Sequence, residues 1–145
     1  MYKRQVYAGL QAVDSSSEIV VIHDAVRPLI RPELIEQSIR QCQAFGAVVV
    51  AVPVTATIKK VQNTLVVETL DRRQLWEIQT PQTFNYQLIL QAYRQAMEEE
   101  FYGTDDAMLV ERLGHEVKIL QGDRYNLKIT TPDDLIIAEC LLRRS

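Results

Sequence analysis

The residue types best suited to chemistry occur together in His23-Asp24-Ala25-Val26-Arg27-Pro28, directly after the apolar run at 19–22. A carboxylate and a guanidinium three residues apart can bind a metal–phosphate group and a polyol hydroxyl together. From the residues alone, an Asp24–Arg27 ion pair that closes a tight loop is the alternative. His115 is the only other histidine, so we interpret His23 as a packed or hydrogen-bonded side chain and not as a metal ligand.

Several further side chains could bind an anion or a hydroxyl group. Arg72, in Asp71-Arg72-Arg73, can clamp a phosphate bidentately, although the segment also fits a solvated basic turn. Lys128 precedes a helix start whose free N–H groups favour anions, although most lysines near helix ends are simply exposed. Three threonines near predicted strand ends or helix starts are hydroxyl donors, and each also fits a cap or strand position: Thr57, Thr80 and Thr104.

The combination of these groups indicates a class of reaction. The sequence shows no Ser/His/Asp or Cys/His arrangement, which argues against a nucleophilic side chain. Arg, Lys, Asp and Thr at strand ends suit transfer at phosphorus instead, where the substrate brings its own nucleophile and the protein supplies position and charge.

The elements that must position these groups follow an alternating α/β pattern. Continuous β-branched runs at 19–22 and 47–52 are typical of strands buried on both faces of a parallel sheet. Between them, Pro32 begins a predicted helix that Gly46 ends. The result is a βαβ unit, and ligands of open α/β sheets bind at the carboxyl ends of the strands.

The rest of the chain predicts a projecting arm followed by three helices. Residues 57–61 and 64–69 flank a turn at Gln62-Asn63, and a lone hairpin needs a surface to pack on, for which a partner subunit is the best candidate. The remaining predicted elements are a short strand at 75–81, a helix at 85–98, a helix capped by Thr104 and ended by Gly114, a strand at 117–120, and a last helix capped by Thr131.

Composition restricts the class of protein. The chain has 145 residues, about one domain, and 16 basic against 19 acidic side chains give a net charge of −3, which argues against nucleic-acid binding by bulk charge. Two cysteines support neither a disulfide framework nor a structural zinc site. No membrane-spanning run or signal peptide is evident, and we expect a cytoplasmic protein.

Seven ordered motifs carry a resemblance to a known family. They are His-Asp-Ala-Val-Arg-Pro at 23–28, Ala-Val-Pro-Val-Thr-Ala-Thr-Ile-Lys at 51–59, Thr-Leu-Asp-Arg at 69–72, Leu-Trp at 75–76, Gln-Thr-Pro-Gln at 79–82, Thr-Asp-Asp-Ala at 104–107 and Lys-Ile-Thr-Thr-Pro-Asp-Asp-Leu at 128–135. In this order and spacing the chain, from Val6 to its end, resembles 2-C-methyl-D-erythritol 4-phosphate cytidylyltransferase of the non-mevalonate isoprenoid pathway.

The resemblance implies a homodimeric α/β enzyme with a Rossmann-like nucleotidyltransferase sheet. Such an enzyme uses CTP and Mg²⁺ to convert methylerythritol phosphate to CDP-methylerythritol and pyrophosphate. By resemblance, Asp24 and Arg27 contact the methylerythritol phosphate and Arg72 and Lys128 hold its attacking phosphate, with a pocket lined by Thr57, Thr80 and Thr104. The segment 53–74 is the dimerisation arm, which carries Arg72 to the active site of the neighbouring subunit.

The chain also departs from the family pattern at its start. The family's opening glycine-rich loop, with the arginine and lysine that bind the triphosphate, has no counterpart among the five scattered glycines. Gln5 stands where the family has a serine, and residues 1–5 match a translated sequencing-library adapter, although a genuine short basic start is the alternative. We therefore expect one truncated domain at 6–145, lacking the first strands of the sheet and having little or no activity.

Two other functions stay open from the sequence. The pentitol-phosphate cytidylyltransferases share the loop at 23–28 and the Lys-Ile/Val-Thr-Thr-Pro ending, although Asp71-Arg72 and Leu75-Trp76 favour the methylerythritol enzyme. A non-catalytic dimerising module that binds a sugar phosphate without CTP is the second alternative.

Overall fold

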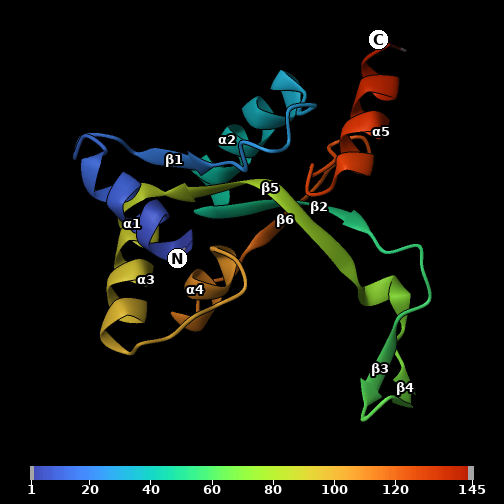
Figure 1. The fold of residues 1–145 in the computed structure, drawn as a ribbon. Helices are drawn as coiled ribbons and strands as arrows, with labels where there is room; N and C mark the ends of the chain where they lie inside the picture. The colour runs from blue at the N-terminus through green and yellow to red at the C-terminus, as the bar shows by residue number, and fades with distance from the viewer. Residues whose placement is uncertain (1, 144–145) are drawn as a thin grey trace.

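A four-stranded mixed sheet in the order β1-β5-β2-β6 forms the centre of the structure (Figure 1). The computed structural model describes residues 2–143, with side chains from residue 5 onward. β5 runs antiparallel to both of its neighbours, whereas β2 and β6 are parallel. The strands are β1 (Ile19–Ile22), β2 (Ala47–Pro53), β5 (Trp76–Asn85) and β6 (Lys118–Gln121).

The structure corrects three expectations about the strands. β1 and β2 run parallel to each other and are joined by α2 (Pro32–Phe45), as the predicted βαβ unit requires, but the antiparallel β5 lies between them, so the sheet is mixed and not parallel. β1 is an edge strand that is not buried on both faces, and Val21 keeps 38% of its surface exposed. The strand predicted at 75–81 continues to Asn85, since β5 passes through Pro81 at a register irregularity where the proline needs no ladder hydrogen bond.

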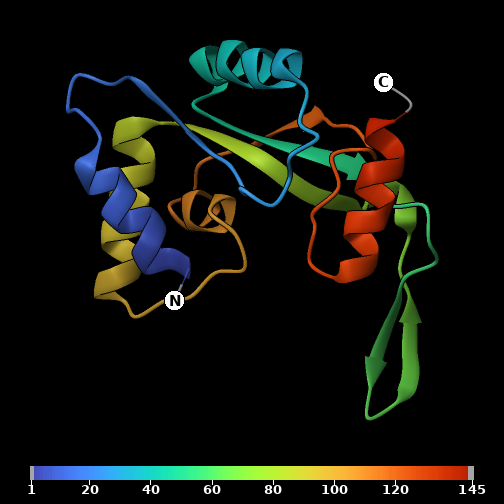
Figure 2. The same ribbon diagram turned by 45° about the horizontal axis from the view of Figure 1, so that its top comes forward.

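Helices cover both faces of the sheet (Figure 2). Val48 and Val50 of β2 pack on one face with residues of α2 (Pro32–Phe45), while Ala47 and Val49 pack on the other. On that second face lie α1 (Tyr2–Ala12), α3 (Tyr86–Glu98) and α4 (Ala107–Arg112). Because both faces are covered, β2 is apolar at consecutive positions, as predicted.

The predicted arm is a separate hairpin that projects from the sheet (Figure 1). It consists of β3 (Lys59–Gln62), β4 (Leu65–Thr69) and the short 3-10 helix η1 (Arg72–Gln74). The turn lies at Asn63–Thr64, one residue later than predicted, and both residues have positive φ (49° and 67°). A two-residue turn of this hand matches the twist of the strands.

Of the two predicted caps at the starts of the later helices, one is confirmed and the other is wrong. Thr131 caps α5 (Pro132–Leu142) in a reciprocal capping box with Asp134, as predicted for the cap. Thr104 does not cap α4, which begins at Ala107 and has the Asp105 carboxylate accepting from the backbone N–H of Met108. β6 begins at residue 118, one later than expected. None of the helices within residues 2–143 has the length and the apolar composition that a membrane span requires.

Candidate active site

A pocket of about 450 Å³ lies where β1 ends, β5 changes register, α4 begins and the segment before α5 crosses the sheet. Four different elements therefore contribute to one cavity, which is typical of ligand sites in α/β folds. Its lining residues are Asp24, Arg27, Ile78, Gln79, Thr80, Gln82, Thr104, Asp105, Asp106 and Lys128.

A β-bulge in β5 turns its polar side chains toward the pocket. In the ladder with β2, Gln82 pairs with Val49 and Ile78 pairs with Ala51, so residues 79–81 lie opposite Val50 alone. Extra residues bend a strand and re-aim its side chains, which is why bulges occur beside binding sites. Both Gln79 and Thr80 line the pocket from this bulge, and Thr80 is nearly buried.

One carboxylate joins the two cationic side chains of the pocket. Oδ2 of Asp24 accepts from Nε of Arg27 at 3.3 Å and lies 3.0 Å from Nζ of Lys128. Arg27 is only 7% exposed and also donates from Nη1 to the backbone oxygen of Asn126 at 2.7 Å. The ion pair that the sequence offered as an alternative is thus present, and it forms part of the pocket wall.

The ring of His23 is hydrogen-bonded through both nitrogens, in agreement with its interpretation from the sequence. Nε2 lies 3.2 Å from the backbone oxygen of Arg27, and Nδ1 lies 3.0 Å from Oγ1 of Thr80. The same hydroxyl oxygen accepts from the backbone N–H of Asp24 at 3.0 Å. These bonds connect the loop after β1 to the bulge of β5.

The structure brings together five of the seven predicted site residues. The residues that line the pocket are Asp24, Arg27, Thr80, Thr104 and Lys128. Thr57 is exposed in the segment between β2 and β3, and Arg72 lies in η1, where Nη1 donates to the backbone oxygen of Thr55 at 2.8 Å. Within one chain, the two arm residues are therefore separate from the pocket.

Three amide side chains at the site, those of Gln79, Gln82 and Asn126, were missed as individual candidates. Nε2 of Gln82 donates to Asp105 at 3.0 Å, and Oε1 of Gln82 accepts from the N–H of Ala107 at 3.0 Å, which holds the start of α4 against β5. Asn126 is buried and donates from Nδ2 to Oε1 of Gln79 and to the oxygen of Thr80. The sequence did offer a signal for these residues, because uncharged amides within a buried segment such as Gln79-Thr-Pro-Gln82 need hydrogen-bond partners.

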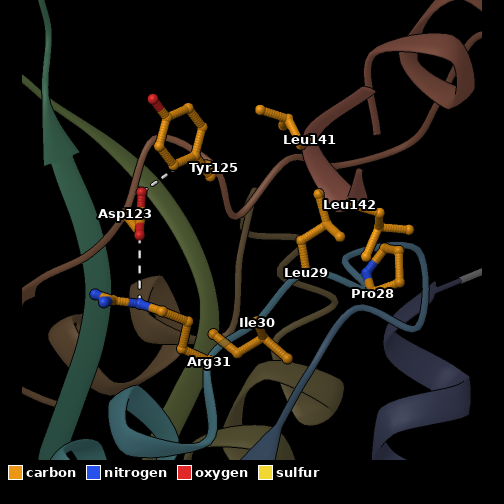
Figure 3. A pocket seen from close by; sticks show the side chains of 8 residues that line it. All are labelled: Pro28, Leu29, Ile30, Arg31, Asp123, Tyr125, Leu141 and Leu142. Atoms are coloured by element: carbon orange, nitrogen blue, oxygen red, sulfur yellow. Dashed lines mark hydrogen bonds and ion pairs between the residues drawn. The ribbon is translucent and has the colours of Figure 1, made fainter. Parts of the chain in front are cut away.

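A second pocket of about 450 Å³ has a different character (Figure 3). Its lining consists mostly of apolar side chains from the loop after β1 and from the end of α5: Pro28, Leu29, Ile30, Leu141 and Leu142. Its charged groups are the exposed Arg31 and the half-buried Asp123, with Nε of Arg31 3.3 Å from Oδ2 of Asp123. The groups suited to phosphate chemistry lie instead in the pocket of Asp24 and Lys128.

Comparison with known families agrees with this geometry. The family model described as IspD, 2-C-methyl-D-erythritol 4-phosphate cytidylyltransferase, matches residues 2–144. The chain belongs to the IspD family. The resemblance drawn from the seven motifs is therefore confirmed.

Individual IspD relatives support the assignment along almost the whole chain. The cytidylyltransferase of Caldanaerobacter subterraneus subsp. tengcongensis is 50% identical over 140 residues, which are 96% of this chain and 62% of that protein. For the Alkaliphilus oremlandii protein the values are 51% identity over 139 residues, 95% of this chain and 59% of the relative. The chain thus spans about three fifths of the length of these relatives.

Solved IspD structures share the fold. The 4-diphosphocytidyl-2C-methyl-D-erythritol synthase of Anaerococcus prevotii superposes with a TM-score of 0.93 at 35% identity, covering 99% of this chain and 67% of that one. The cytidylyltransferase of Thermus thermophilus gives a TM-score of 0.88 at 32% identity, covering 97% and 69%. The mixed sheet and separate hairpin are therefore those of IspD proteins.

Proposed function

We propose that the pocket of Asp24, Arg27 and Lys128 binds 2-C-methyl-D-erythritol 4-phosphate, the substrate of CTP-dependent cytidylyl transfer. The observation that carries the proposal is the convergence of five predicted site residues from separate elements on one cavity. Family membership and the printed names of the relatives supply the substrate class.

In the proposed reaction, a phosphate oxygen of the substrate attacks the α-phosphorus of CTP. A new P–O bond forms, and the bond to pyrophosphate breaks. In this proposal Lys128, the more exposed of the two cations, holds the attacking phosphate, and the carboxylate of Asp24 accepts from a polyol hydroxyl. Catalysis then rests on position and charge and needs no covalent intermediate.

The charge of the pocket supports a contribution from a second subunit. The lining holds three carboxyl side chains, Asp24, Asp105 and Asp106, and only two cationic ones. A phosphate dianion needs further positive charge, and Arg72 lies on an exposed arm outside its own pocket. We therefore propose that Arg72 of a neighbouring copy completes the site through the arm of a homodimer.

The Mg²⁺ that the family resemblance implies does not fit a site made by these residues. Within residues 2–143 no group of three or more His, Cys, Asp or Glu side chains is placed to hold a metal ion. Asp24 is already bonded to two cations, and Asp105 accepts from Gln82 and from the N–H of Met108. Because substrate phosphates often supply ligands of Mg²⁺, we expect the ion to arrive with the triphosphate.

Calorimetric titration of the purified chain with methylerythritol phosphate tests the proposal. We expect binding that Lys128→Ala and Arg72→Ala each weaken by about tenfold or more, the loss of one charge-assisted contact. Lys118→Ala and Arg73→Ala are matched controls, because Lys118 lies over the Phe45 ring and Arg73 pairs with Asp71, both away from the pocket. Equal effects of the paired variants, or no binding at all, would overturn the proposal.

Two further titrations, with a pentitol phosphate and with CTP and Mg²⁺, test the alternatives that the sequence left open. Tighter binding of a pentitol phosphate than of methylerythritol phosphate would favour the pentitol-phosphate enzymes. Binding of the sugar phosphate without binding of CTP and Mg²⁺ would agree with the expected lack of activity and with a non-catalytic module. Tight CTP binding would contradict the expectation that the nucleotide site is missing.

A further inference from the structure

We propose that His23 is a positioning residue, which sets the geometry of the pocket by holding Thr80 and the loop of Asp24 and Arg27 in one arrangement. The inference rests on the proposed function, because it concerns the same pocket. His23 does not line that pocket and acts through its hydrogen bonds to two residues that do.

The hydrogen bonds determine which ring nitrogen carries the proton. The backbone oxygen of Arg27 can only accept, so Nε2 of His23, 3.2 Å away, must donate to it. In a neutral ring Nδ1 is then an acceptor, and the hydroxyl of Thr80 at 3.0 Å must donate. The Thr80 oxygen in turn accepts from the N–H of Asp24. The result is a series of three hydrogen bonds, each donated in the same direction, from the Asp24 amide through Thr80 and His23 to the Arg27 carbonyl.

These hydrogen bonds fix both ends of the turn that carries Asp24 and Arg27, the ion pair of the pocket. The N–H of Arg27 donates to the backbone oxygen of Asp24 at 2.9 Å, so the turn is already bonded internally. His23 adds a bond at the Arg27 end, and Thr80 adds one at the Asp24 end. Both side chains of the ion pair are thereby held relative to the β5 bulge, where the Thr80 carbonyl also accepts from Asn126.

The direction of these hydrogen bonds assigns Thr80 a specific chemical role. Because its hydroxyl proton is directed to His23, Thr80 can offer a ligand only an oxygen lone pair. Thr80 therefore supports the site chiefly by fixing the Asp24 backbone. Small displacements of such supporting groups cost affinity and rate out of proportion to their size.

Nitrogen NMR of the full chain tests the tautomer without any ligand. The chain has two histidines, so the variant His115→Gln leaves the signals of His23 alone. At a pH where the ring is neutral, we expect a protonated Nε2 and an unprotonated Nδ1, and Thr80→Val should shift the ring toward a mixture of tautomers. A protonated Nδ1, or a mixture already present in the parent chain, would overturn the assignment.

Paired variants then test positioning in the titration with methylerythritol phosphate. Thr80→Val and His23→Gln should each weaken binding by about tenfold, the loss of roughly one hydrogen bond, whereas Thr80→Ser should stay within about threefold. The double variant should bind methylerythritol phosphate no more weakly than either single variant, because each substitution breaks the same series of hydrogen bonds. Additive losses, or an unaffected Thr80→Val, would overturn the proposal.

Amide hydrogen exchange separates this inference from the proposed function. The N–H of Asp24 should exchange at least about tenfold faster in His23→Gln and Thr80→Val than in the parent chain, while the N–H of Ile89 in the α3 core stays unchanged. Faster exchange in a chain that binds no methylerythritol phosphate would reject the substrate and keep the role of His23. Unchanged exchange at Asp24 would reject that role whatever the chain binds, and faster exchange at Ile89 as well would mean global destabilisation and would also reject it.

Discussion

Nζ of Lys128 lies 3.0 Å from Oδ2 of Asp24, the oxygen that also accepts from the buried guanidinium of Arg27. A residue just before the last helix is thus bonded to the loop that follows the first strand. The N–H of Ile129 also donates to the backbone oxygen of Val26 at 2.8 Å. These contacts make the two segments one wall of the pocket, so changes at Asp24 should affect both stability and binding.

Replacement of Asp24 by asparagine should lower the free energy of unfolding by about 2–3 kcal/mol, because Arg27 is buried and loses its counter-charge. Urea denaturation at neutral pH measures this loss. Asp71→Asn is the matched control, since Asp71 pairs with the exposed Arg73 and its loss should leave stability nearly unchanged. Equal losses in the two variants would show that Asp24 does not stabilise the buried arginine.

Replacement of Gly122 by alanine should destabilise the protein by about 1–3 kcal/mol through overpacking. A Cβ atom there would lie 2.6 Å from Cγ1 of Val50 and 2.7 Å from Oε1 of Gln79, the acceptor of the Asn126 amide. Thermal unfolding measures the effect. Gly9→Ala in α1 should instead stabilise by about 0.5–1 kcal/mol, because nothing lies within 4 Å of its added Cβ. A neutral Gly122→Ala would contradict the close packing at this position.

The capping box of α5 should make stability depend on acid. Hydrogen bonds lower the pKa of Asp134 to about 2 from its ordinary value of 3.8. The bonds from the backbone N–H groups of Thr130 and Thr131 have the largest effect, and the bonds with the two hydroxyl groups have a smaller one. The folded pKa lies below the unfolded one, so the stabilisation is complete above about pH 4 and is lost as the pH falls toward 2.

Carbon NMR of the Asp134 carboxyl group, recorded against pH, measures this pKa. Thr131→Ala should raise it, because the variant removes the hydroxyl bond and weakens the box. In the variant Asp134→Asn, the free energy of unfolding should lose the part of its pH dependence that comes from the Asp134 carboxyl group. An Asp134 midpoint near 4 in the parent chain would show that the box does not form in solution.

A single charge on the arm should dissociate the proposed homodimer. Leu65 on β4 is 72% exposed, and its neighbours Val66 and Val67 are also exposed apolar residues. We expect Leu65→Asp to convert a dimer to a monomer in light scattering coupled to size exclusion, with little change in melting temperature. Met97→Asp, at an exposed apolar position near the end of α3, should leave the dimer intact. A monomeric parent chain would contradict the proposed role of the arm.

Much of the fold could be predicted because its signals are local. The apolar run at 47–52, Gly46 in a left-handed conformation after α2, and the Thr131 cap of α5 each depend on residues close in sequence. The errors arose where a distant contact prevailed. Asp106, not Thr104, is the N-cap residue of α4, and the Asp105 carboxylate, which Gln82 also contacts, accepts from the N–H of Met108. The mixed sheet arises because the distant β5 pairs between β1 and β2.

The α/β class, the projecting hairpin, the family and the residue types of the proposed site could all be inferred from the sequence alone. The folded structure was needed to show that five of the seven predicted site residues share one pocket, while Thr57 and Arg72 lie apart on the arm. It also revealed the bulge at 79–81 and the bonds of His23 and Asn126. The physical reason is that capping, turn formation and hydrophobic periodicity act between near neighbours in the chain. Strand register and buried hydrogen bonds join segments far apart in sequence, and their partners are set only when the sheet assembles.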